Sequence, residues 1–179
     1  MTDTFTPLTR FAVPGRIAVS HRAAAEWQTA TLTEVRRETP HASTFRFAVP
    51  AWAGHLPGQH LMLRLTAEDG YTAQRHYSIA SAPDDAGHIE LTLDHVEGGE
   101  VSGWFHTVAK PGDEVEVRGP LSGFFAWPGD RPALLIGAGS GVVPLMSMVR
   151  HRRARGLDVP LRLVVSARSP QELIYAREF

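Results

Sequence analysis

The sequence predicts a β-barrel or β-sandwich domain followed by part of an α/β domain. Three observations support this fold class. Between positions 26 and 118, six short runs alternate apolar with polar residues, and turn residues separate them. One stretch in this region has helical spacing instead. Beyond Gly119–Pro120, two continuous apolar runs flank a glycine-rich loop and a helical pattern, which is typical of a β-loop-α-β unit.

The β domain is expected to contain six strands and one helix. Prolines, glycines and aspartates at the breaks between the runs are the punctuation of an antiparallel sandwich or barrel. Apolar residues at i, i+3, i+4 and i+7 from Val101 to Val108 indicate the helix. The expected strands lie at positions 27–35, 45–49, 61–65, 75–81, 89–94 and 114–118.

The α/β part begins with Ala133–Ile136, an apolar run that is too short for a helix and suits a buried parallel strand. Gly137–Gly141 and a helical pattern follow, and Leu161–Val165 is a second buried run. Ser169–Glu172 provides an N-cap, a proline in the first turn and a capping glutamate, so we expect a further helix to start there and still to be running at Phe179. Two parallel strands do not complete a doubly wound sheet of about five or six strands. We therefore expect the remainder to be missing or supplied by another chain.

Three segments are expected along the chain. Positions 1–25 show no sustained periodicity and contain prolines, so we expect a loosely attached N-terminal arm. Positions 26–128 would form the β domain, and positions 129–179 would form the partial α/β domain.

Length and composition are those of an ordinary globular protein. Of the 179 residues, 43% are hydrophobic and 21% are charged. The formal net charge of −1 provides no general attraction to nucleic acid or to an anionic membrane. The chain has no cysteine, which excludes a disulfide, a thiolate zinc site and a cysteine-ligated iron–sulfur cluster within it. No apolar run approaches the roughly 18 residues of a membrane span, so we expect a cytoplasmic protein that binds neither membrane nor nucleic acid.

Two segments of the β domain could bind an anionic, aromatic ligand. Arg75, Tyr77 and Ser78 place a guanidinium, a flat ring and a hydroxyl on one short strand, with Ser78 on the opposite face from the other two. Gly99–Ser102 opens the expected helix, where glycine and unpaired N–H groups let a phosphate approach the backbone. A solvated strand and an ordinary turn are the alternative interpretations of these two segments.

The loop Gly137–Pro144 could hold a dinucleotide. Its three glycines exceed the one that a tight strand-to-helix turn needs, and a closely approaching pyrophosphate explains the surplus, although Val142 replaces the third glycine of the dinucleotide fingerprint. The next strand ends in Ser166–Ala167–Arg168, where an NAD site would offer a carboxylate to the ribose. Arg168 therefore favours a 2′-phosphate and hence NADP. A solvated loop charge is the alternative interpretation of Arg168.

Taken in this order, the segments resemble the ferredoxin–NADP reductase family of flavoproteins. In that family a six-stranded antiparallel barrel binds flavin through R-x-Y-[ST] and a later G-x-x-[ST], and an α/β domain binds NAD(P) through G-x-G-x-G-x-x-P. The resemblance runs from about Trp27 to Phe179, and the tail from Leu173 is similar to the family's helix after the second strand of the nucleotide domain. It implies a flavin-binding barrel with one helix, followed by an incomplete doubly wound NAD(P)-binding domain.

The resemblance also implies roles for individual residues. Tyr77 would stack against the flavin and Ser78 would face its N5 atom, which makes these two the expected catalytic residues. Arg75 would pair with the flavin pyrophosphate, beside the N–H groups near Gly99. The implied cofactor-binding residues are Arg75, Tyr77, Ser78, Ile79, Gly99, Val101, Ser102, Gly137, Gly139, Ser140, Gly141, Pro144 and Arg168.

The implied function is that of a flavin-dependent reductase. Such an enzyme takes hydride from NAD(P)H and passes electrons to a protein acceptor such as ferredoxin or an oxygenase. FAD is the expected cofactor with FMN as the alternative, and NADP(H) or NAD(H) is the expected substrate. The alternative function is a flavin-binding module without reductase activity, because the nucleotide domain is incomplete.

Other conspicuous residues have plainer interpretations. The basic stretch Arg150–Arg155 is expected to be a solvated helix end, with a docking surface for an acidic electron carrier as the alternative. The nine histidines show no spacing typical of metal ligands. The aromatic residues expected in the core or at the domain junction are Trp52, Trp104, Trp127, Phe124 and Phe125.

Overall fold

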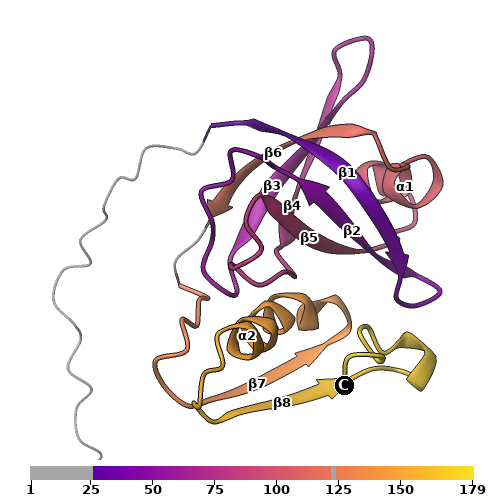
Figure 1. Cartoon of the computed structure of the whole chain (residues 1–179). Helices are drawn as coiled ribbons and strands as arrows, with labels where there is room; N and C mark the ends of the chain where they lie inside the picture. The colour runs from indigo at the N-terminus through magenta and orange to yellow at the C-terminus, as the bar shows by residue number, and fades with distance from the viewer. Residues whose placement is uncertain (1–25, 122–123) are drawn as a thin grey trace, which may run out of the picture.

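A computed structural model describes residues 26–121 and 124–179, and the arm expected at positions 1–25 lies outside the described residues (Figure 1). The described chain forms a six-stranded antiparallel sheet with one α-helix, followed by a two-stranded parallel sheet with a second α-helix. This order confirms the predicted fold class. Within the described residues, no helix combines the length and the apolar character needed to cross a bilayer.

The first sheet closes into a barrel. Its strands follow the order β4-β3-β6-β1-β2-β5. The two outermost strands meet where Ile79 forms a β-bridge with Leu91. Next to it, the N–H of Ala80 donates to the carbonyl of Glu90 at 2.7 Å. These contacts decide between the barrel and the sandwich. The strands are β1 (Gln28–Arg37), β2 (Ala42–Ala48), β3 (His60–Thr66), β4 (Thr72–Ser78), β5 (His88–Asp94) and β6 (Glu114–Leu121).

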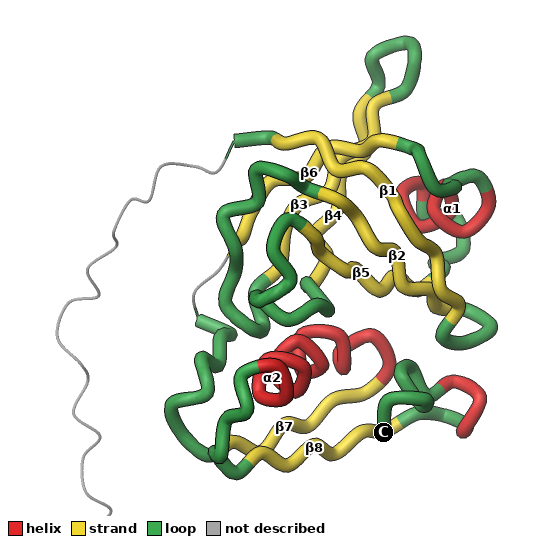
Figure 2. Tube along the Cα trace, in the orientation of Figure 1, coloured by secondary structure: helices red, strands yellow, loops and turns green. Residues whose placement is uncertain are grey.

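Strand alternation builds the barrel core. Phe45 and Phe47 on β2 and Leu91 on β5 are fully buried, and burial of one such side chain contributes about 1.5–3 kcal/mol. The helix α1 (Glu100–Thr107) lies against the barrel, as Figure 2 shows. Its Phe105 packs edge-on against Phe45, with ring centroids 4.9 Å apart. The predicted helix is therefore confirmed, and apolar contacts fix its position.

The second sheet pairs β7 (Ala133–Ala138) with β8 (Leu161–Ser166) in parallel. A short 3-10 turn, η1 (Gly139–Val142), leads into α2 (Val143–Ala154). Figure 1 shows α2 between this sheet and the barrel. One side of α2 packs against β7, and the other side packs against Ala80 of the barrel. The predicted β-loop-α-β unit is therefore present.

The helix expected to start at Ser169 does not form. A single 3-10 turn, η2 (Pro170–Glu172), ends at Leu173, whose φ of −78° and ψ of 101° are extended. Tyr175 then has a left-handed backbone with a φ of 64°. The reason is burial: Ile174 and Tyr175 would point about 100° apart on a helix, yet here α2 and the barrel bury both side chains.

Phe124 and Phe125 lie at the surface, contrary to the expectation of a core or junction position. Their exposed fractions are 91% and 53%. Trp52 and Trp127 are buried as expected, and Trp104 packs partly buried against the barrel core. Trp127 belongs to a cluster with residues of α2 and β7, so it fills the junction and leaves the two phenylalanines outside.

The basic stretch at the end of α2 is not uniformly solvated. The side chain of Arg150 is only 15% exposed and forms an ion pair with Glu90 of β5 at 3.0 Å. Arg155 forms an ion pair with Asp84 at 3.1 Å and stays largely exposed. The expectation of a solvated helix end is therefore wrong for Arg150, because α2 packs against the barrel at this residue.

Candidate cofactor site

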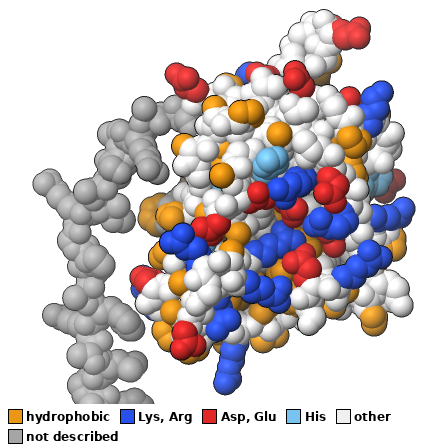
Figure 3. Space-filling view, viewed as in Figure 1, with side chains coloured by type: hydrophobic (Ala, Val, Ile, Leu, Met, Phe, Trp, Pro, Cys, Tyr) orange, Lys and Arg blue, Asp and Glu red, His pale blue; other side chains and the backbone are white. Residues whose placement is uncertain are grey.

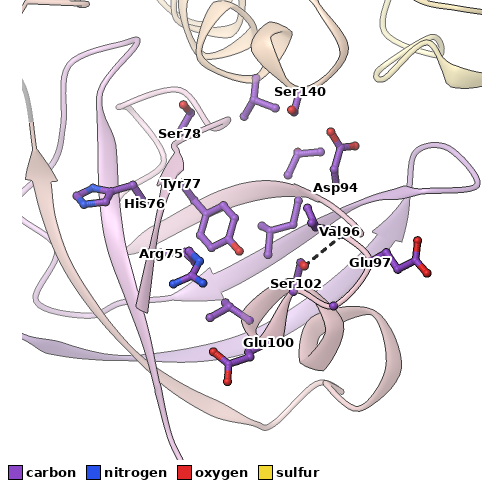
Figure 4. Close-up of a pocket in the computed structure, with 16 residues that line it drawn as sticks. Arg75, His76, Tyr77, Ser78, Asp94, Val96, Glu97, Glu100, Ser102 and Ser140 are labelled. Carbon is purple, nitrogen blue, oxygen red and sulfur yellow. Dashed lines mark hydrogen bonds between the residues drawn. The ribbon is translucent and has the colours of Figure 1, made fainter. Parts of the chain in front are cut away.

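A pocket of about 550 Å³ beside β4 brings the sequence motifs together (Figure 4). Arg75, Tyr77 and Ser78 line it from β4, and Gly99–Ser102 line it from the start of α1. Ser140 reaches the same pocket from the loop after β7. The volume suits a small-molecule ligand. The other lining residues are His76, Thr92, Leu93, Asp94, Val96, Glu97, Gly98 and Val143.

Strand alternation orients the side chains of β4. Figure 4 shows Arg75 and Tyr77 on the pocket side of the strand and His76 on the other side. The guanidinium of Arg75 is exposed and donates to the carbonyl of Gln74 at 2.8 Å. Burial raises the pKa of Tyr77 above its ordinary value, and the charge of Arg75 lowers it in part. The phenol of Tyr77 is therefore neutral at physiological pH, so this wall offers one positive charge beside one uncharged ring.

Ser78 is the last residue of β4 and is partly buried. Figure 4 places it at the end of the strand nearer to Ser140. Each serine hydroxyl can both donate and accept a hydrogen bond. The pocket therefore has a hydroxyl from the barrel and a hydroxyl from the loop after β7.

The Gly99–Ser102 motif has a local structural explanation. The hydroxyl of Ser102 is buried and accepts a hydrogen bond from the N–H of Val96 at 3.2 Å. A Cβ atom on Gly99 would lie 2.5 Å from this hydroxyl oxygen and 3.0 Å from the carbonyl oxygen of Val96. Glycine and serine are thus needed together to close the loop before α1. The ligand-binding interpretation rests on the backbone of this loop and on the Ser102 hydroxyl, which accepts from Val96 and can still donate one hydrogen bond.

The N-terminus of α1 is open toward the pocket. No side chain caps this helix end, so the N–H groups of its first turn lack partners within the helix. The carboxylate of Glu100 points away from the pocket in Figure 4 and accepts a hydrogen bond from the hydroxyl of Tyr71 at 3.0 Å. An anion in the pocket would therefore face N–H groups that have no partner within the helix and the positive end of the helix dipole.

The three glycines of the loop Gly137–Pro144 are each required for a different reason. A Cβ atom on Gly137 would lie 2.7 Å from Cδ1 of Leu145, so this glycine lets β7 and α2 approach closely. Gly139 has a φ of 50°, which favours glycine. At Gly141 a Cβ atom would meet open space. Folding therefore explains the first two glycines, whereas the third leaves the backbone accessible to a ligand.

Comparison with known proteins identifies the barrel. A family model described as the oxidoreductase FAD-binding domain matches residues 29–126, which is more than half of the chain. The chain belongs to this family. The resemblance deduced from the three motifs is therefore confirmed, and the FAD-binding domain is the part that contains Arg75–Ser78 and Gly99–Ser102.

Relatives of this FAD-binding domain are longer proteins. The chain is 38% identical over 149 residues to a glycine betaine monooxygenase reductase subunit of Pseudomonas aeruginosa, covering 81% of this chain and 40% of the relative. It is 34% identical over 146 residues to ferredoxin–NADP reductase B of Sorangium cellulosum, covering 81% and 56%. The crystal structure of an Amycolatopsis cytochrome P450 reductase superposes with a TM-score of 0.76 at 28% identity, covering 91% and 50%. The chain thus spans about half the length of the proteins that it matches.

A second pocket, of about 520 Å³, lies at the carboxyl ends of β7 and β8, which is where open α/β sheets bind ligands. Gly139 and Arg168 line it. Arg168 is largely exposed, and its Nε atom donates to Glu172 at 3.0 Å. The sequence interpretation missed Glu172 and also His41, which reaches this pocket from the barrel. Only the spacing of four between Arg168 and Glu172 could have suggested their pairing.

Some expected site residues do not reach the first pocket. The side chain of Ile79 is fully buried in the barrel core, and its N–H donates to the carbonyl of Gln59. Pro144 lies in the first turn of α2 and lines neither pocket. The sequence interpretation missed Asp94, which ends β5 and lines both pockets. Because strand residues two apart share a face, the polar alternation of Glu90, Thr92 and Asp94 along β5 was the signal for Asp94.

Proposed function

We propose that this chain is the flavin-binding and nucleotide-binding portion of an NAD(P)H-dependent reductase that delivers electrons to a protein acceptor. One observation carries the proposal: residues from the barrel motifs and Ser140 from the glycine-rich loop line one pocket. A reductase must bring a flavin and a nicotinamide together, and a cavity shared by both halves meets that requirement.

The first pocket fits FAD. The Arg75 guanidinium and the unpaired N–H groups at the start of α1 are suited to a pyrophosphate. The half-buried ring of Tyr77 is suited to stack on a flat aromatic system. When bound, FAD would supply the redox chemistry, accepting hydride and releasing electrons one at a time. The protein's part is to bind, to orient and to hold a hydrogen bond at Ser78, which can donate or accept as the bound ring changes state.

The glycine-rich loop and the second pocket fit the nucleotide. The open backbone at Gly141 would receive the pyrophosphate of NAD(P)H. Ser140 would donate a hydroxyl hydrogen bond from the side of the first pocket. The adenosine end would occupy the second pocket, where Arg168 is the candidate partner for a 2′-phosphate. The nicotinamide would then enter the first pocket between Ser140 and Ser78.

The acceptor is proposed from the relatives. The names of two of them describe a reductase subunit of a monooxygenase and a ferredoxin–NADP reductase. The chain itself has no cysteine to hold an iron–sulfur cluster. We therefore propose a separate ferredoxin, an oxygenase component or a further domain as the electron acceptor.

A flavin-binding module without reductase activity is the second candidate, and one observation favours it. The outward face of the β7–β8 sheet exposes Leu134, Ile136 and Val164, although parallel sheets are normally covered on both faces. Anaerobic mixing distinguishes the two functions. We expect the FAD-loaded protein to lose its yellow colour with NADPH or NADH. A yellow protein that neither nucleotide bleaches would support the module instead.

A further inference from the structure

Tyr175 joins the C-terminal segment to the wall of the cofactor pocket. Its side chain is fully buried, and its hydroxyl oxygen lies 2.5 Å from Oγ1 of Thr92 on β5. Thr92 also lines the pocket. On the other side, Tyr175 packs in one apolar cluster with Val142 and Val143, which lie two and three residues after Ser140. Tyr175 therefore bonds to the barrel and shares an apolar cluster with the segment that carries Ser140.

The neighbouring hydroxyls fix the direction of this hydrogen bond. Thr44 on β2 donates its hydroxyl hydrogen to Glu38 at 2.8 Å. Because a threonine hydroxyl has a single hydrogen, Thr44 must accept from Thr92, which is 2.8 Å away. Thr92 has then used its own hydrogen and must accept from Tyr175. A directed chain therefore runs from Tyr175 through the two threonines to a carboxylate, and hydrogen bonds in such a chain strengthen one another.

Two features keep Tyr175 protonated and in place as the donor to Thr92. Burial raises the pKa of Tyr175 well above its ordinary value, so the phenol retains the hydrogen that the chain requires. Arg150 lies over the ring, with its guanidinium carbon 5.0 Å from the ring centroid. Nη1 of Arg150 donates to the carbonyl of Ala80 at 2.9 Å and to Glu90 at 3.0 Å. Its Nε donates to Glu178 at 3.1 Å, so Arg150 ties α2 to both the barrel and the C-terminal segment.

We propose that Tyr175 is a positioning residue whose hydrogen bond to Thr92 sets the placement of the Ser140 loop relative to Ser78. This inference rests on the proposed function, in which a hydride, carrying two electrons and one proton, leaves the reduced nicotinamide and reaches bound flavin within this pocket. Rates of such transfers depend steeply on placement, and a misplacement of about 1 Å can cost about 100-fold. The hydrogen bond between Tyr175 and Thr92 lies at the wall of the pocket that Ser78 and Ser140 both line.

The substitution Tyr175→Phe removes the hydroxyl and keeps the ring beneath Arg150. We expect single-turnover reduction of bound FAD by saturating NAD(P)H to slow by about tenfold or more, with the Kd for FAD changed by less than about twofold. The charge-transfer absorbance of the nucleotide-bound protein should weaken in the same variant. Thr92→Val should have a similar effect, and the double variant should be no slower than the worse single variant, because both changes break one chain.

Thr33→Val is the matched control. It removes a threonine hydroxyl that donates to the carbonyl of Arg46 at 3.0 Å between β1 and β2, and neither residue lines the cofactor pocket, so the reduction rate should stay at the wild-type value. If Tyr175→Phe leaves the rate and the charge-transfer band unchanged, the positioning role is wrong. A loss of FAD affinity as large as the loss of rate would show general damage to the barrel and would also overturn it.

Amide hydrogen exchange tests the hydrogen bond between Tyr175 and Thr92 in the protein without any cofactor. In Tyr175→Phe, amides of α2 should exchange about 3- to 10-fold faster, the effect of losing one hydrogen bond, while β3 and β6 keep their protection. If wild-type protein binds FAD but neither nucleotide reduces it, the proposed function fails, and the exchange result still decides about Tyr175. Unchanged protection of α2 would then overturn the inference.

Discussion

Ser78, the last residue of a barrel strand, and Ser140, in the loop after β7, line the same cavity. They line one cavity because α2 packs against Ala80 and Arg150 of α2 forms an ion pair with Glu90 of the barrel. Figure 3 shows charged side chains of both signs gathered on the face of the molecule that is viewed in Figure 1. The packing of the two halves therefore creates the site, and neither motif forms it alone.

Arg75→Ala should release FAD. Hydrogen bonds to a charged group contribute about 1.5–3 kcal/mol, so we expect the Kd for FAD to rise about 10- to 100-fold. Titration of the flavin-free protein, followed by flavin fluorescence, measures this change. Arg131→Ala is the matched control, because that arginine is exposed and pairs only locally with Asp130. Full FAD occupancy of Arg75→Ala at stoichiometric flavin would contradict the assignment.

Ser78→Ala should slow flavin reduction without releasing the flavin. The hydroxyl contributes about one hydrogen bond, or about 1 kcal/mol, so we expect an approximately fivefold lower rate of reduction by NAD(P)H. Flavin content, measured from the absorbance spectrum of the purified protein, should stay within about twofold of wild type. If content falls as much as the rate, Ser78 contributes to the structure of the site and not to the transfer.

Substitutions at two glycines of the loop Gly137–Pro144 should have different effects, one on stability and the other on nucleotide binding. Gly137→Ala should lower the Tm, because its Cβ would crowd Leu145 and overpacking costs about 1–3 kcal/mol. Gly141→Ala should leave the Tm nearly unchanged, since a Cβ there meets open space, but should weaken NAD(P)H binding about tenfold. Thermal unfolding and nucleotide titration of both variants provide the comparison. Normal nucleotide affinity in Gly141→Ala would remove the role of this backbone.

Arg168 and Glu172 should control the choice between NADPH and NADH. The Glu172 carboxylate accepts a hydrogen bond from Nε of Arg168 at 3.0 Å. This negative charge would repel a 2′-phosphate. Glu172→Gln should therefore shift the ratio of the two Kd values about fivefold toward NADPH, whereas Arg168→Ala should shift it toward NADH. Equilibrium titration with each nucleotide measures the ratio. Neither residue contacts the 2′-phosphate if the ratio is the same in wild type and both variants.

His55 should make stability fall in mild acid. Its Nδ1 accepts from the indole N–H of Trp52 at 3.3 Å, so Nε2 carries the hydrogen and faces the carbonyl of Ser81 at 3.2 Å. Burial lowers the pKa of His55 in the folded protein. The unfolded chain therefore binds more protons below the ordinary pKa of about 6.5, and the free energy of unfolding decreases as the pH falls through that value.

Urea unfolding at about pH 7.5 and about pH 5.5 measures this loss. His55→Gln keeps a donor and an acceptor but cannot titrate, so the loss of stability between the two pH values should be smaller in this variant. The two proteins differ only at this side chain, so the difference between their losses of stability reports on His55. An equal loss of stability in both proteins would contradict the prediction.

Local pattern predicted most of the fold, because alternation and turn residues act within a few positions. The residues of β2, β3 and β5 face the core as their spacing requires, with Phe45 and Leu91 fully buried. The order of the motifs also predicted which segments meet at the pocket. Ser169–Glu172 misled the prediction, since its capping signal is local, whereas burial of Tyr175 depends on α2 and β5 together.

Long-range pairing also explains the site features that the sequence did not predict. The burial of Arg150 on α2 depends on Glu90, which lies on strand β5 of the barrel. The place of Asp94 at both pockets required the closed barrel and the second sheet together. Glu90 and Arg150 are far apart in sequence, and so are Asp94 and the residues after β7 and β8 that line its pockets. No periodicity or motif within a single segment could therefore identify these groupings.

The central claim is that one pocket holds the flavin between Arg75 and the start of α1, with its ring reaching toward Ser140. A crystal structure of the FAD-loaded protein tests it most directly. We predict density for the pyrophosphate at Arg75 and at the first N–H groups of α1, and density for the ring system against Tyr77. Density for FAD at any other surface, with this pocket empty, would contradict the claim.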